Sequence, residues 1–146
     1  EEKELKGLEE KIRNEIEPYL PLVASDLLQS IECFRKGELL ASVLICGRII
    51  VFLIEKIKSQ IPNISQIEAS QQWNKVIEFL KERGIIEGKG EIEKRIIDAI
   101  KQYRNKFAHT VGTYPSIEEA LIILSGTVFL VDKCAKNIDK LEFLKG

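Results

Sequence analysis

The sequence predicts an all-α protein, folded as an up-down bundle of four to five core helices with an accessory helix at the N-terminus. Apolar residues recur at steps of three and four positions through most of the chain, which is the spacing of one helix face. Glycine and proline separate these periodic segments, and no segment shows the strict alternation of a half-buried strand. Because 146 residues are enough for one hydrophobic core but few for two, we expect a single domain over residues 1–146.

The accessory helix is expected over residues 1–17, where one narrow apolar stripe runs through a charged segment: Leu5, Leu8, Ile12 and Ile16. Pro18 ends this helix, and the core of the bundle is expected over residues 22–137. The second helix spans residues 22–34 and stops before Gly37.

The third helix, over residues 38–59, is apolar on nearly all sides, as expected of the central member of a bundle. Its longest apolar run, residues 39–54, is too short and too interrupted to span a membrane. The interrupting residues are Ser42, Gly47 and Arg48.

Three further helices follow. Ser65 or Ser70 is expected to cap the fourth helix, which Gly84 closes. The fifth helix ends near His109, and its apolar face consists of Ile92, Ile96, Ile100, Tyr103 and Phe107. Ser116, with Glu119 three residues later, predicts a capping box at the start of the sixth helix.

Composition restricts the classes of function. The net charge of −1 and the pI of about 6.0 exclude a domain-wide basic surface, so any contact with RNA must be local. The three cysteines, Cys33, Cys46 and Cys134, lie far apart in apolar surroundings, which is typical of core residues in a reducing cytoplasm. We expect no disulfide, no metal and no cofactor. Since the chain has no methionine, we also expect it to be part of a longer protein with a neighbouring domain.

The polar residues of the fifth helix carry its chemistry. At about 100° per residue, the side chains opposite the apolar face are Asp98, Gln102, Asn105 and His109. Arg104 falls on the flank of the apolar face, where it either extends to solvent, pairs with a carboxylate of a neighbouring helix, or binds an anion. His109 is either a structural residue at the helix end or a group for proton transfer near neutral pH.

Arg48 is a single charge among apolar residues of the third helix. A charge in such surroundings is costly unless it is paired, so we expect a buried, structural ion pair between Arg48 and a carboxylate of another helix, with Asp26 of the second helix as the first candidate.

The segment that contains Arg104, Asn105 and His109 resembles the R-x(4-6)-H motif of HEPN domains, and its placement late in a helical bundle agrees with that family. A second likeness is the apolar stretch of residues 40–56, with Gly47-Arg48 inside it and Ile54-Glu55-Lys56 at its end, which is similar to one poorly characterised HEPN branch. The two likenesses together extend over about residues 22–137.

The resemblance implies metal-independent cleavage of RNA, in which the 2′-hydroxyl attacks the adjacent phosphorus, in a defence or toxin-antitoxin setting. In this chain His109 would transfer a proton, Arg104 would stabilise the phosphate, and Asn105 would hydrogen-bond to either of them. Lys101 and Lys106 are expected to contact the RNA.

Several partners are expected besides RNA. Arg104 and His109 are five residues apart, so on an ideal helix they point about 140° apart and lie about 7.5 Å apart along the axis. A symmetric homodimer would pool both motifs in one cleft, which is also what the resemblance implies. An antitoxin or a fused domain is a further expected partner. The alternative function is a non-catalytic HEPN-like interaction or ligand-binding module of a larger protein.

Overall fold

The computed structural model describes residues 1–145, which form a bundle of six α-helices with no strand in this range, as the sequence predicts. The helices are α1 (Glu2–Lys11), α2 (Pro21–Arg35), α3 (Leu39–Lys58), α4 (Ala69–Glu82), α5 (Glu91–His109) and α6 (Ile117–Lys136). Short helical turns follow α1 at Ile12–Ile16, precede α4 at Ile64–Gln66, and end the chain at Ile138–Lys140 and Glu142–Leu144. None of the helices in residues 1–145 has both the length and the apolar character needed to cross a membrane.

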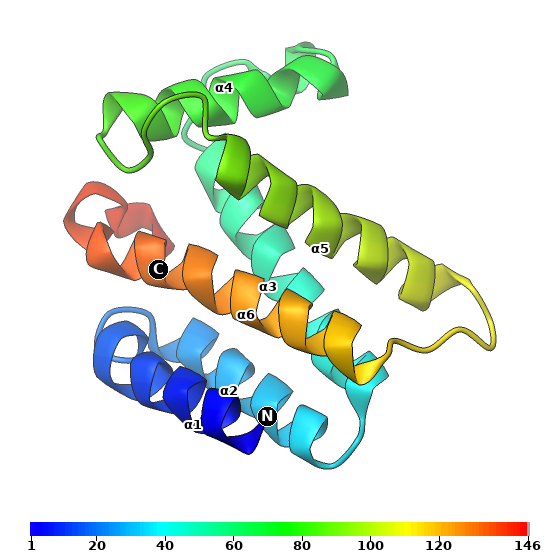
Figure 1. The fold of residues 1–146 in the computed structure, drawn as a ribbon. Coiled ribbons are helices and arrows are strands. Elements are labelled where there is room, and N and C mark those ends of the chain that lie inside the picture. The colour runs from blue at the N-terminus through cyan, green and yellow to red at the C-terminus, as the bar shows by residue number, and fades with distance from the viewer. Residues whose placement is uncertain (146) are drawn as a thin grey trace.

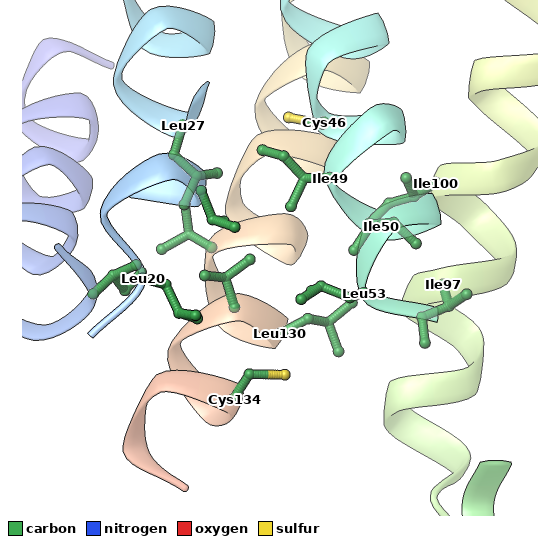
Figure 2. Close-up of a cluster of buried hydrophobic side chains, with 14 of the residues drawn as sticks. Leu20, Leu27, Cys46, Ile49, Ile50, Leu53, Ile97, Ile100, Leu130 and Cys134 are labelled. Carbon is green, nitrogen blue, oxygen red and sulfur yellow. The ribbon is translucent and has the colours of Figure 1, made fainter. Parts of the chain in front are cut away.

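The third helix is the central member of the bundle, as expected. It packs against α2, α5 and α6, and Figure 1 shows α6 running between the α1–α2 pair and α5. Figure 2 shows Ile50 and Leu53 of α3 beside Ile97 and Ile100 of α5, with Leu27 of α2 on the other side of the cluster. The core therefore lies around α3, and α5 packs on it through Ile97, Ile100 and Phe107. The expected apolar face is wrong at its first residue, because Ile92 is 65% exposed.

The three cysteines are free and buried, in agreement with their expected place in the core: Cys33, Cys46 and Cys134. Burial raises the pKa of the Cys46 thiol, and it raises that of Cys134 to about 12. Both groups therefore behave as small apolar residues at neutral pH.

The N-terminal segment contributes directly to this core. Leu5, Ile12 and Ile16 are buried among the other apolar side chains, at the three- and four-residue spacing seen in the sequence. Lys11 also lies 3.5 Å from the buried carboxylate of Asp132 on α6. The segment is thus packed against the bundle along its apolar stripe.

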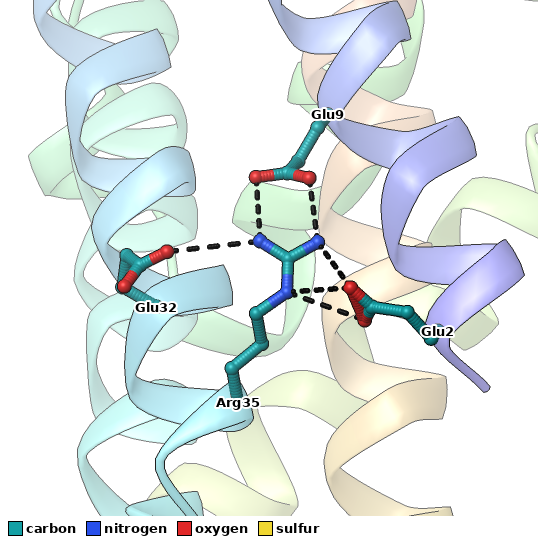
Figure 3. Close-up of polar contacts among 4 residues, drawn as sticks. All are labelled: Glu2, Glu9, Glu32 and Arg35. Carbon is teal, nitrogen blue, oxygen red and sulfur yellow. Dashed lines mark hydrogen bonds and ion pairs between the residues drawn. The ribbon is translucent and has the colours of Figure 1, made fainter.

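One arginine joins α1 to α2 at the surface, as Figure 3 shows. Arg35 donates two parallel hydrogen bonds to Glu9, at 2.7 and 2.6 Å, and its Nε donates to Glu2 at 3.0 Å. Glu32 approaches the same guanidinium at 3.6 Å. The hydrogen bonds from Arg35 lower the pKa of the Glu9 carboxyl and raise that of Arg35.

The sequence predicted the start of α6 correctly and the start of α4 incorrectly. The capping box of α6 is confirmed, because the Glu119 amide donates to Ser116 Oγ at 3.1 Å and the Ser116 amide donates to Glu119 Oε1 at 2.9 Å. The cap expected for the fourth helix is wrong. Ser65 lies inside the preceding turn and Ser70 inside α4, which begins after Glu68 without a side-chain cap.

Candidate functional site

The last ten residues of α5 hold the candidate site. Phe107 is buried against the core, while Asn105 and His109 are exposed on the opposite side of the helix, as the projection predicts. His109 is the last residue of α5, and the backbone becomes extended at Thr110. The side chains of Asn105 and His109 are therefore open to solvent.

Arg104 lies on the side of α5 that faces α3, and it is partly buried there. Its aliphatic stem crosses the backbone of Gly47 at very close range. A Cβ built on Gly47 would lie 2.7 Å from Cγ and 3.0 Å from Nε of Arg104, and closer still to Cδ. Only a residue without a side chain leaves room for the arginine at this crossing of the two helices.

No carboxylate of residues 1–145 pairs with Arg104, and its guanidinium makes no hydrogen bond within this range. The sequence explains why. Residues 39–54 of α3 contain no Asp or Glu, and neither do residues 99–117. The ion pair with a neighbouring helix, one of the three alternatives for Arg104, is therefore absent from the described part of the chain.

The two lysines expected to contact RNA lie on different sides of α5. Both are exposed, and Lys101 belongs to the flank of Arg104. Lys106 lies toward α6. The hydrogen bond from the Ser116 amide is the main cause that lowers the pKa of the Glu119 carboxyl, and the positive charge of Lys106 lowers it further. Its ammonium is also 5.3 Å from the centre of the Phe107 ring. These residues do not form one patch in a single chain.

Arg104, Asn105 and His109 make no hydrogen bonds to one another in a single chain. Arg104 points to the α3 side, whereas His109 lies at the helix end on the opposite face. The arrangement presents an arginine and a histidine on one helix, but it does not bring them together.

The ion pair between Arg48 and Asp26 is present, with Nε and one terminal nitrogen donating to Asp26 Oδ2 at 3.0 and 2.8 Å. The expected burial is wrong, because 66% of the Arg48 side chain and 33% of the Asp26 side chain are exposed. The reason is that, within residues 1–145, this strip of α3 is open to solvent. Val51, one turn further along, is exposed there too.

Two aromatic residues near the core, Tyr103 and Trp73, are partly buried. Tyr103 stacks on Phe107, with ring centres 5.9 Å apart and planes 5° apart. Trp73 lines an apolar cavity of about 50 Å³ between α3, α4, α5 and α6, and its buried Nε1 has no partner within residues 1–145. Glu93 also lines this cavity, and its carboxylate lies 4.0 Å from Lys133.

Sequence reasoning did not single out Gly47 as part of the site. The signal was one glycine in the middle of a helix that is otherwise built from large apolar residues, a pattern that indicates a close approach by another group. Among residues 1–145, no three His, Cys, Asp or Glu side chains form a group that could hold a metal ion.

Comparisons with protein-family models, with curated proteins and with solved structures found no match to this chain.

Proposed function

We propose that the chain is a HEPN-like endoribonuclease domain that cleaves RNA without a metal ion, in a defence or toxin-antitoxin setting. The observation that carries this proposal is Arg104, a partly buried arginine whose stem packs on Gly47 and which has no acidic partner within residues 1–145. The segments on either side of this contact, residues 39–54 and 99–117, contain no Asp or Glu. A charge in this setting is best stabilised by an anion from outside the chain. The exposed His109 at the end of the same helix supplies a group for proton transfer.

The proposed reaction uses the 2′-hydroxyl of the RNA as the nucleophile. Its oxygen bonds to the adjacent phosphorus, the bond to the 5′ oxygen breaks, and the products are a 2′,3′-cyclic phosphate and a 5′-hydroxyl. One imidazole removes the 2′ proton and a protonated imidazole supplies a proton to the leaving oxygen. Arg104 stabilises the charge that develops on the phosphate oxygens. Asn105 is placed one turn before His109, where it can hydrogen-bond to the imidazole or the phosphate.

We propose that the active form is a symmetric homodimer. In a single chain, Arg104 and His109 point to different sides of α5, so a second copy is needed to complete the cleft. Exposed apolar residues directly follow His109 and suit an interface at this end of α5: Val111, Tyr114 and Ile117. Light scattering should report twice the chain mass of 16.7 kDa. A monomer that nevertheless cleaves RNA would contradict the shared cleft.

The proposal is tested by incubating labelled RNA with the protein in EDTA, next to His109→Ala and Arg104→Ala. Wild type should cleave in the presence of the chelator, and both variants should be inactive while keeping the helical circular dichroism spectrum. Lys36→Ala is a matched control, because Lys36 is an exposed cation at the end of α2 and not on α5. Loss of cleavage in the control, or its persistence in either clean site variant, would overturn the mechanism.

A non-catalytic interaction module is the second candidate. The same exposed residues after His109 favour it, since they could bind a different protein or a fused neighbouring domain. A chain that does not cleave RNA would favour this second function. For either function we propose the reducing cytoplasm as the compartment, because all three cysteines are free and buried.

A further inference from the structure

Gly47 lies in the middle of α3 with a helical backbone, so no turn or left-handed conformation requires a glycine there. A glycine is needed at this position because the side chain of Arg104 occupies the space next to the backbone of residue 47. The Cγ, Cδ and Nε atoms of Arg104 all lie where a side chain on residue 47 would begin. The contact joins the bundle's central helix to the helix that carries the candidate site.

The contact also determines where the guanidinium can lie. Three successive atoms of the Arg104 side chain rest on α3, so the arginine cannot swing freely, as an exposed arginine on a helix surface does. The position of the planar end therefore depends on how closely the stem can approach Gly47. An arginine held in this way loses less conformational entropy when it binds a phosphate than a free one does.

We propose that Gly47 is a positioning residue for RNA cleavage, which acts by holding Arg104 in the orientation that stabilises the phosphate. This inference rests on the proposed function. Gly47 does not touch the RNA, and its effect passes entirely through the stem of Arg104. A methyl group on residue 47 would lift the stem and displace the guanidinium while leaving His109 and the lysines unchanged.

The test compares Gly47→Ala with Gly7→Ala. Gly7 is also a glycine inside a helix, but a Cβ built on it meets nothing within 4 Å. Both changes add one methyl group to a helical glycine, so the pair separates the contact with Arg104 from the general effect of alanine on a helix. We expect Gly47→Ala to lower kcat by about 100-fold, as a misplaced catalytic group does, with KM little changed. Gly7→Ala should keep wild-type kcat.

A stability cycle tests the contact without any RNA. In the wild-type background, Gly47→Ala should lower the urea midpoint, because the methyl group collides with Arg104. In the Arg104→Ala background the collision is gone, and the same change should raise the midpoint, since alanine favours a helix. Gly7→Ala should have the same effect in both backgrounds.

The outcomes are distinct. If wild type cleaves RNA and Gly47→Ala has wild-type kcat, the positioning role is wrong while the proposed function stands. If Gly47→Ala has the same effect on the midpoint in both backgrounds, the contact itself is refuted. If wild type neither binds nor cleaves RNA, the proposed function fails and the role in cleavage fails with it, whatever the cycle shows.

Discussion

Replacing Arg48 by alanine is expected to lower the free energy of unfolding only slightly. The pair with Asp26 has good hydrogen-bond geometry, at 2.8 and 3.0 Å, yet two thirds of the Arg48 side chain is in contact with water. Exposed ion pairs of this kind contribute about 0.2–1 kcal/mol, because water screens the attraction and two flexible side chains must be ordered. Removal of one partner from a buried pair would instead cost about 3–5 kcal/mol.

The measurement is a double-mutant cycle by urea denaturation, with Arg48→Ala, Asp26→Ala and the two combined. The cycle isolates the energy of the pair from other effects of each substitution. We expect a coupling energy below about 1 kcal/mol, and each single variant should melt within about 4 °C of wild type. A loss of 3 kcal/mol or more in Arg48→Ala would show that the pair is buried in solution, and it would refute the open strip on α3.

Three other changes test the fold. Ser116→Ala should destabilise the protein by about 1 kcal/mol through loss of the α6 cap, whereas Ser70→Ala inside α4 should have no such effect; urea denaturation measures both. Ile50→Ala should cost about 2–5 kcal/mol, because Ile50 is 1% exposed at the centre of the bundle, and Val51→Ala is its partly exposed control. The third concerns pH. Since Arg35 holds the pKa of Glu9 below the ordinary value of 4.5, the pair contributes stability above that pH, and this is lost as the pH falls through the lower folded-state pKa. Arg35→Ala should therefore flatten the acid limb of a melting-temperature profile, and an unchanged limb would contradict the pairing in Figure 3.

Features that depend on neighbouring residues in the chain could be predicted from the sequence. The capping box of Ser116 and Glu119 is local, and so is the exposure of His109 opposite the apolar face of α5. The central place of α3 followed from its apolar composition alone. The start of α4 could not be predicted in this way, because no serine side chain caps its first turn. Instead, Gln72 of α4 donates hydrogen bonds to the carbonyls of Ile64 and Ile67 in the preceding segment.

Features that depend on which helices meet could not be predicted. The apolar neighbours of Arg48 in the sequence suggested burial, but the strip of α3 that carries Arg48 is open to solvent. The contact between Gly47 and Arg104 joins residues on different helices, and its closeness depends on how α3 and α5 cross. The pairing of Arg48 with Asp26 could be predicted because a charge among apolar residues needs an opposite charge, whereas its exposure depended on the packing of the helices.

The most direct test of the central claim uses two RNA oligonucleotides in EDTA that differ by one 2′-oxygen at each cleavage site. The first is all RNA, and the second has a 2′-deoxy nucleotide on the 5′ side of each mapped cleavage site. If the 2′-hydroxyl is the nucleophile, the protein should cleave the first, leave a 2′,3′-cyclic phosphate, and leave the second intact at those sites. Equal cleavage of both oligonucleotides, or no cleavage of either at micromolar protein, would contradict the account.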